Sequence, residues 1–221
     1  MNKNIETIDL GTIKYAEAFK YQEELFYEKI KAKNENKINK NHLLFCEHPH
    51  VYTLGKSGEE NNLLINKDFL SKINAEFVKT NRGGDITYHG YGQLVIYPIF
   101  DLENFSILIK KYIYKIEEVI IKTLLEYSIK TERLDKAAGI WLTDRQTPQK
   151  ICALGVRVSR GITMHGLALN INTNLDYFKH INPCGFQDKG ITSIEKELGH
   201  KVNPEEVKIY VKKYFNEVFV V

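Results

Sequence analysis

The chain of 221 residues lacks the features that mark secreted, membrane and nucleic-acid-binding proteins. It holds three cysteines, an odd number without regular spacing, which excludes a disulfide framework and indicates a reducing compartment. No apolar run approaches the length of a membrane span, and the first residues lack the apolar segment of a signal peptide. The net charge of +3 is small beside 31 basic and 28 acidic residues, so nucleic acid is not an expected partner. We therefore expect a soluble, cytoplasmic protein with free thiols.

The length and the hydrophobic content of 43% suffice for one full core, and no internal repeat is visible. The polar segment 32–42 is the nearest approach to a linker, and its short length suits a connection between two elements better than one between two domains. We expect a single domain over residues 1–221.

Hydrophobic periodicity predicts helices near both ends of the chain and strands between them. The expected helices cover residues 15–31, 106–129 with Ser106 as N-cap, a short segment opening at Thr192 or Ser193, and a last segment from Pro204. The expected strands cover residues 7–10, 43–54 with a break at Pro49, 93–100, 138–143, 150–158 and 162–172. This order favours an α+β fold, in which a mixed, largely antiparallel sheet is backed by helices.

A glycine-rich segment, RGGDITYHGYGQ, covers residues 82–93. Glycine removes the Cβ atom that blocks close approach, so backbone N–H groups of such a loop can cradle a ligand. A glycine-rich hairpin with incidental polar neighbours explains the segment equally well. It contains no dinucleotide fingerprint, and the lysine that a P-loop requires is missing.

Cys184 follows Pro183 and precedes Gly185, a composition typical of a turn that exposes its central side chain. A thiolate is well suited to taking an acyl group from another thioester, so Cys184 is a candidate nucleophile. The alternative is an inert buried cysteine, since a reactive thiol needs an electropositive setting.

Lys150 is the candidate for that electropositive partner, able to lower a thiol pKa or to carry a proton. It opens the segment KICALGVRV, where regular alternation places Lys150, Cys152 and Leu154 on one face of a strand. The alternative is a solvated lysine at a strand end. Cys152 is a rival nucleophile, but a thiol inside an apolar strand is usually part of the core.

Histidines offer weaker candidates. Cys46, His48 and His50 alternate in CEHPH, a spacing that suits zinc on a regular strand, but Pro49 breaks the geometry and no fourth ligand has standard spacing. We expect no metal. His89 and His165 lie beside glycines, where each suits either an oxyanion donor or a structural histidine.

Taken together, the motifs resemble the lipoyl(octanoyl) transferase family, which serves lipoate biosynthesis. The motifs occur in the family's order: EHPHVYTLGKSG, RGGDITYHGYGQLVIYP, AAGIWL, KICALGVRV, HGLALNIN, NPCGF and GITSI. The resemblance implies a fold similar to the catalytic domain of biotin and lipoate protein ligases. It also implies that Cys184 carries an octanoyl group as a thioester and that Lys150 lowers the pKa of this thiol. Tyr91, where the family usually has proline, and Cys152 depart from the family pattern.

The resemblance assigns substrate binding to three stretches of small and polar residues. These are Arg82, Gly83, Gly84, Asp85, Ile86, Thr87, Tyr88 and His89, then Ala153, Leu154 and Gly155, and finally Gly166, Leu167 and Ala168.

The resemblance also implies the two protein partners. The donor is octanoyl-acyl carrier protein, and the acceptors are lipoyl domains of 2-oxoacid dehydrogenase E2 subunits and the glycine cleavage H protein. A thioester becomes an amide without a nucleotide, so no cofactor is expected, and the enzyme is expected to be a monomer. Two alternatives stay open: an ATP-dependent lipoate or biotin ligase, and a non-catalytic binding protein of the same fold.

Overall fold

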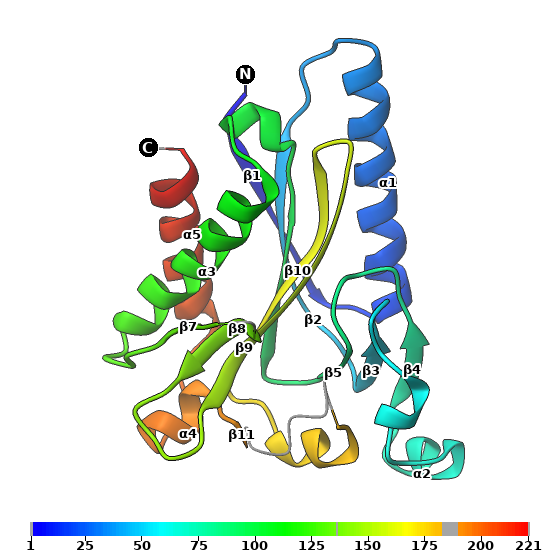
Figure 1. Ribbon diagram of the computed structural model, residues 1–221, viewed down its shortest axis with the longest axis vertical. Helices are drawn as coiled ribbons and strands as arrows, with labels where there is room; N and C mark the ends of the chain where they lie inside the picture. Colours follow the sequence, from blue (N-terminus) through cyan, green and yellow to red (C-terminus); the bar gives the residue numbers. More distant parts are fainter. Residues whose placement is uncertain (1, 136, 183–189, 221) are drawn as a thin grey trace.

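The computed structural model describes residues 2–135, 137–182 and 190–220. A large mixed sheet forms its centre and a small sheet lies beside it (Figure 1). In these ranges the strands of the large sheet follow the order β1-β2-β6-β10-β9-β8-β7, with β11 paired to β9. Their bounds are β1 Ile5–Thr12, β2 Asn41–Glu47, β6 Gln93–Ile99, β7 Glu132–Leu134, β8 Ala137–Leu142, β9 Gln149–Ser159, β10 Ile162–Asn170 and β11 Gly190–Ile191. The small sheet has the order β4-β3-β5, with β3 Val51–Leu54, β4 Glu76–Lys79 and β5 Ile86–His89.

Most strand pairs of both sheets are antiparallel, and the parallel pairs are β1–β2, β11–β9 and β3–β4. The three predicted strands between residues 138 and 172 are confirmed as β8, β9 and β10. The β9–β10 turn has positive φ at both Arg160 (51°) and Gly161 (79°), as a tight hairpin turn of matching twist requires. The expected α+β class with a mixed, largely antiparallel sheet is therefore confirmed.

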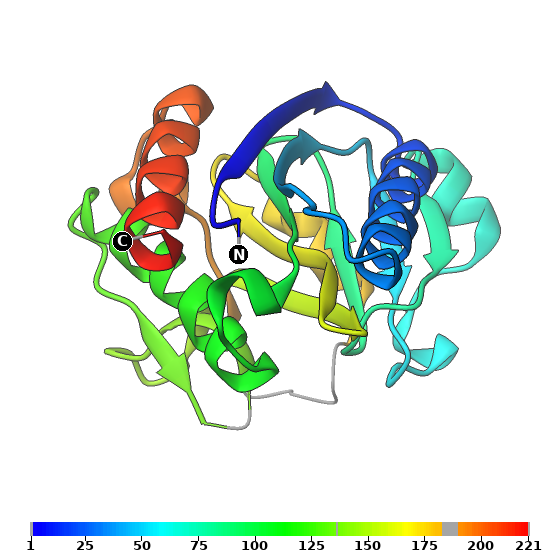
Figure 2. The ribbon, with the colours of Figure 1, turned by 90° about the horizontal axis from the view of Figure 1, so that it is seen from above.

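Helices cover both faces of the large sheet, with α1 on one side and α3 and α5 on the other (Figure 2). Their bounds are α1 Tyr15–Asn34, α2 Lys67–Lys72, α3 Ile109–Leu125, α4 Ile194–Leu198 and α5 Pro204–Phe219, and the 3-10 helices are η1 Glu60–Asn62, η2 Leu102–Phe105 and η3 Leu175–His180. Ser193 caps α4 by accepting from Lys196 N, and Pro204 opens α5, both as predicted.

The N-cap prediction for Ser106 is wrong. Ser106 has φ 54° and ends η2, and α3 begins three residues later at Ile109, after an N-cap residue whose side chain cannot accept a hydrogen bond, Leu108. A left-handed residue cannot begin a helix, so the apolar periodicity identified the helix but not its first turn.

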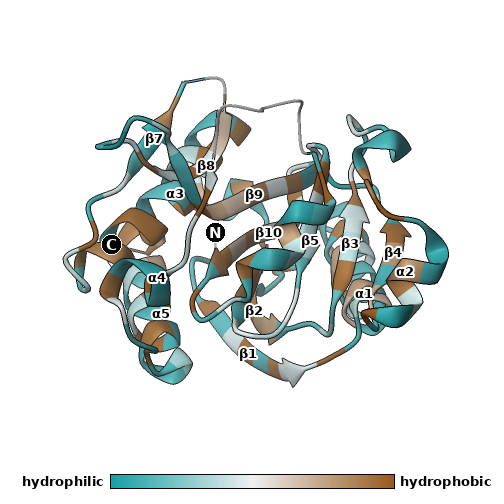
Figure 3. Cartoon of the chain, turned by 90° about the horizontal axis from the view of Figure 1, so that it is seen from below, coloured by the Kyte–Doolittle hydropathy of each residue, from teal (hydrophilic) through white to brown (hydrophobic). Residues whose placement is uncertain are grey.

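Alternation along β6 separates two cores. Leu94 and Ile96 point toward α3 and α5, whereas Val95 and Tyr97 point toward α1. Figure 3 shows β9 and β10 between the α3–α5 layer and the small sheet. In the described part of the chain every helix is too short or too polar to cross a bilayer.

Candidate active site

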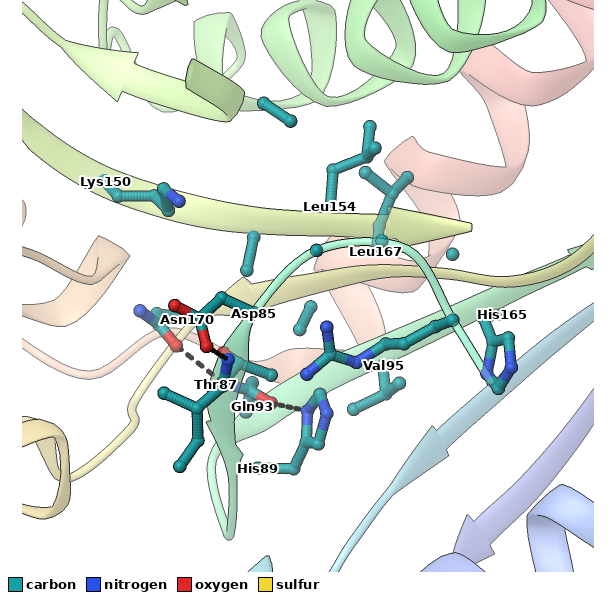
Figure 4. A pocket seen from close by; sticks show the side chains of 18 of the residues that line it. Asp85, Thr87, His89, Gln93, Val95, Lys150, Leu154, His165, Leu167 and Asn170 are labelled. Atoms are coloured by element: carbon teal, nitrogen blue, oxygen red, sulfur yellow. Dashed lines mark hydrogen bonds between the residues drawn. The ribbon is translucent and has the colours of Figure 1, made fainter. Parts of the chain in front are cut away.

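A cavity of about 270 Å³ lies between the large sheet and the loop that leads into β5. Its floor is the α1-facing side of β6, β9 and β10, and its roof is the segment 82–89. Small and apolar residues form much of the floor: Val95, Ala153, Gly155, Gly166 and Ala168. Leu154 and Leu167 also border the cavity, but their side chains pack in the core on the side of α3 and α5. Figure 4 shows Lys150 at one end of this pocket and His165 at the other.

The roof is held against β9 by a backbone hydrogen bond from Gly83 N to Val156 O, 2.9 Å. Gly155 permits this approach, because a Cβ atom there would lie 2.8 Å from Gly83 O. Gly84 has φ +84°, a conformation that side chains disfavour. The glycines of this loop thus bring its backbone onto the sheet, as a backbone cradle requires.

Arg82 is buried and stabilises the loop from within. Its guanidinium donates to Thr53 O (2.6 Å) and to Thr53 Oγ1 (3.0 Å) of β3. The Asp85 carboxylate accepts from Asn62 Nδ2 (2.9 Å) and from the Ile86 backbone N–H (2.6 Å). The two charged residues of the roof are therefore tied to the small sheet and its loops.

A buried chain of hydrogen bonds crosses the pocket from the small sheet to β11. Thr53 Oγ1 donates to His89 Nε2 (3.4 Å), His89 Nδ1 donates to Gln93 Oε1 (2.8 Å), and Gln93 Nε2 donates to Asn170 Oδ1 (2.9 Å; Figure 4). Asn170 Nδ2 then donates to Thr192 O (3.0 Å), and Thr192 N donates to Lys150 O (3.0 Å). This chain of hydrogen bonds links His89, at the end of the roof, to the residue that follows β11 and to the backbone of Lys150 on β9.

Burial keeps the pocket histidines neutral. Desolvation, with smaller contributions from the neighbouring His48 and Arg82, lowers the pKa of His89 to about 3. Desolvation also lowers the pKa of His165 to about 3, with a contribution from the charge of Arg82. The hydrogen bonds of His89 fix the Nδ1–H tautomer, which is the neutral form.

Lys150 faces this pocket, because β9 carries one extra residue. Ile140 pairs with Cys152, whereas Trp141 pairs with Lys150, so Ile151 is an added residue between the two pairs. This β-bulge leaves both Ile151 and Cys152 in the core, and Lys150 on the pocket side with Ala153 and Gly155. The prediction that Lys150, Cys152 and Leu154 share a face is wrong, because regular alternation does not hold across a bulge.

The Lys150 ammonium lies 4.6 Å from the centroid of the Trp141 ring, a cation–π contact. Its side chain also passes close to Gly139, where a Cβ atom would lie 3.5 Å from Lys150 Cδ and Cε. Gly139 has φ +113° and packs on Cys152 O, so its backbone conformation and its close packing both favour glycine. The methylene groups of Lys150 lie against this glycine.

Cys184, the predicted nucleophile, lies outside the described residues. Cys152 is fully buried, and desolvation raises its thiol pKa far above the ordinary value. Such a thiol is not ionised at neutral pH and is closed to a substrate, as expected for a core cysteine.

Most of the predicted substrate-binding residues line the pocket. Two do not: Gly83 acts through its backbone bond to Val156, and the Tyr88 side chain points into the small-sheet core and bonds His50 Nδ1 (2.7 Å). The sequence reasoning missed Tyr15, Val95, Tyr97, Asn170, Ala137, Ala138, Phe178, Ile181 and Ile191, which also line it. Val95 and Tyr97 alternate with Gln93 on β6, a signal that was available in the sequence.

No group of three metal-ligating side chains occurs within residues 2–135, 137–182 and 190–220. Cys46 Sγ and His48 Nε2 lie 3.6 Å apart, but the His48 ring also pairs with Ile13 O and Tyr97 OH. His50 lies elsewhere, between the hydroxyls of Tyr88 and Tyr177. Pro49 thus separates the two histidines into different clusters, as its break of the strand indicates.

Comparison with known sequences places this pocket in a family. Residues 14–216 match the Lipoyl protein ligase A/B catalytic domain, and the chain belongs to this family. A protein of Bacteroides thetaiotaomicron named octanoyltransferase is 52% identical over 91% of this chain and 89% of its own length. A protein of the same name from Christiangramia forsetii is 51% identical over 99% of this chain and 97% of its own length.

Solved structures agree on the fold. A bi-partite lipoate protein ligase from Thermoplasma acidophilum superimposes with a TM-score of 0.69 at 15% identity, over 97% of this chain and 84% of its own. A biotin protein ligase from Aquifex aeolicus in complex with biotin and ATP gives a TM-score of 0.56 at 14% identity, over 97% and 70%. The predicted similarity to the ligase fold is therefore confirmed.

Proposed function

We propose that the chain is a single octanoyltransferase domain over residues 1–221. It is an acyltransferase of protein lipoylation, in accord with relatives about half identical over nearly the whole chain. In our proposal the octanoyl group passes from octanoyl-acyl carrier protein to a thioester on Cys184, and then to a lysine of an acceptor lipoyl domain.

The observation that carries the proposal is the position of Lys150 at one end of a pocket floored by small and apolar residues. An acyl chain placed over β9 and β10 exchanges water for Val95, Ala153 and Ala168. Burial of seven saturated carbons stabilises the bound chain by up to about 6 kcal/mol, at about 0.8 kcal/mol for each carbon. Such a pocket favours a medium-length acyl chain over a polar substrate.

In the first step the Cys184 thiolate, favoured by the Lys150 ammonium, attacks the octanoyl carbonyl carbon. The bond from this carbon to the carrier sulfur breaks, and the carrier leaves as its thiol after taking a proton. The aromatic face of Trp141 holds the ammonium and keeps its charge at this end of the pocket.

In the second step the acceptor lysine amine attacks the enzyme thioester, and an amide forms as the bond to Cys184 Sγ breaks. The proton that the amine loses goes to Lys150 or to water. Conversion of a thioester to an amide is downhill, so the reaction needs no nucleotide.

The partners in this proposal are two protein domains. The acceptors are lipoyl domains of 2-oxoacid dehydrogenase E2 subunits and the glycine cleavage H protein, and the reaction is the first step of endogenous lipoylation. The enzyme works as a monomer in the cytoplasm.

The structure gives less support to an ATP-dependent ligase. A phosphate-binding loop needs basic groups that face a ligand, but Arg82 donates to Thr53 and the loop continues with the carboxylate of Asp85. The Asp85 carboxylate would repel a phosphate at this position.

The test is intact-protein mass spectrometry after mixing with octanoyl-acyl carrier protein in the absence of ATP, followed by peptide mapping. The expected result is one octanoyl increment on Cys184. Cys184→Ser abolishes the adduct, and Lys150→Ala slows its formation about 100-fold or more, as expected for loss of a proton-transfer or ion-pair partner. Lys130→Ala, which removes an exposed lysine that does not line the pocket, serves as the matched control.

Two results oppose the proposal. Full activity of folded Cys184→Ser or Lys150→Ala removes the assigned residues. Acylation of a lipoyl domain from free acid only when ATP is added moves the protein to the ligase class.

A further inference from the structure

A wall of rings bounds the pocket along its α1 side and at the end opposite Lys150. This ring wall consists of Tyr15 from α1, His89 from β5, Tyr97 from β6 and His165 from β10. His165 pairs in register with Val156, six residues beyond Lys150 on β9. At about 3.3 Å for each residue of a strand, the floor between Lys150 and the wall is at most roughly 20 Å long.

Small residues line the floor up to the wall and then stop. Ala153 and Ala168 leave room for a chain over β9 and β10, whereas the roof fills the space at Gly155, where Gly83 O lies 2.8 Å from the position of a Cβ atom. An octanoyl chain advances less than ~1.5 Å for each carbon–carbon bond, or ~10 Å in all, so the rest of the floor accommodates the thioester and the lysine. A longer chain that starts at Lys150 approaches the ring wall.

The rings of the wall brace one another. Tyr15 stacks on His89 with centroids 6.1 Å apart, and both rings meet His48 edge-on at 5.4 Å and 5.9 Å. Phe19 stacks on His165 at 5.6 Å. A chain that is too long must therefore displace a packed ring instead of a mobile side chain.

The four rings differ in how firmly they are tied. Two are bound to buried side chains, His89 to Gln93 and Tyr97 to His48, and His165 is bound to the half-buried Asn81. The Tyr15 hydroxyl donates to Thr80 Oγ1 (3.1 Å), a side chain on the partly exposed connection after β4. Tyr15 is also the first residue of α1, so truncation of its ring opens the wall without breaking the core of the sheet.

We propose that Tyr15 sets the upper limit on the length of the acyl chain that the pocket accepts. This inference rests on the proposed function, in which the thioester lies at the Lys150 end. Loss of the Tyr15 ring extends the pocket beyond the wall and admits two or more further methylene groups. Loss of the hydroxyl alone leaves the wall in place.

The experiment is a competition between equimolar octanoyl and decanoyl thioesters of acyl carrier protein, with the ratio of the two enzyme adducts read by intact mass. Tyr15→Ala raises the decanoyl-to-octanoyl ratio up to about 15-fold, or about 4-fold for each methylene at about 0.8 kcal/mol of burial. Tyr15→Phe keeps the wild-type ratio. Tyr21→Ala, which removes a tyrosine from the same helix but outside the pocket, keeps it as well.

Tyr15→Leu provides a second test, because it keeps more of the packing and is expected to give a smaller rise in the ratio. Thermal melting shows which variants are folded. A wild-type ratio in every folded variant that lacks the Tyr15 ring overturns the assignment of Tyr15, while octanoyl adduct on the wild-type protein still supports the transferase function. Absence of any adduct on the wild-type protein overturns both.

Discussion

Gly155→Ala is expected to reduce acyl transfer by moving the roof loop off β9. Gly155 does not have positive φ, so alanine suits its backbone and the effect is steric. The added Cβ lies 2.8 Å from Gly83 O and 3.2 Å from Arg82 Cδ, closer than these atoms tolerate. Overpacking of this kind costs about 1–3 kcal/mol. In a chain of this length the melting temperature then falls by roughly 2–12 °C.

The effect on activity is expected to be similar in free energy to the effect on stability. The added methyl group strains the bond from Gly83 N to Val156 O and shifts the residues that follow it in the roof. A displacement of about 1 Å in a substrate-positioning segment costs about 100-fold in rate. The assay is the initial rate of octanoyl adduct formation, measured beside thermal melting at the same pH.

Gly199→Ala is the control. Gly199 has φ +78° and open space around its missing Cβ, so alanine there costs about 1–2 kcal/mol of backbone strain far from the pocket. The two variants are expected to lose similar stability, and only Gly155→Ala to lose activity. Wild-type rate and melting temperature in Gly155→Ala would refute the view that the roof is seated on β9 at this glycine.

Three further changes test the site. Cys152→Ala costs about 1 kcal/mol of stability as a small core deletion and leaves adduct formation intact, and loss of the adduct by mass spectrometry would contradict its role as a core residue. Because the pKa of His89 and of His165 is about 3, the unfolded chain binds protons below pH 6.5 that the folded chain does not. Each histidine thus removes up to about 1.4 kcal/mol of unfolding free energy for each pH unit between pH 6 and 4, and equal urea midpoints at pH 7.5 and 5.0 would argue against this. Asn170→Ala removes one acceptor of the Gln93 amide, which keeps Tyr88 O, and the donor to Thr192 O, so it lowers stability by about 1–3 kcal/mol and slows adduct formation. Unchanged melting would show that the hydrogen-bond chain is dispensable.

The order of the elements could be read from the sequence because each carries a periodic pattern. The alternation in residues 162–172 and the helical stripe of α3 survive in the structure as β10 and Ile109–Leu125. Two strands of the small sheet, β4 and β5, were not predicted, because each has four residues and so short a pattern cannot be distinguished from a loop.

The pocket residues were predicted where a motif contained them, and missed where only the fold brings them in. Asn170 and Tyr15 lie 155 positions apart in sequence, and their meeting at one cavity depends on how α1 packs on β10. The orientation of Lys150 could not be predicted either, because an added residue such as Ile151 has no signature in the local sequence pattern.

The bulge at Ile151 decides on which face of β9 the Lys150 side chain lies. An even number of strand steps separates two residues that share a face, but five steps separate Lys150 from Gly155, and both line the cavity. Without the bulge, five regular steps would turn the ammonium toward the helical layer, with every residue type of the pocket retained. The chemistry of this end of the cavity thus depends on a count of residues as much as on their identity.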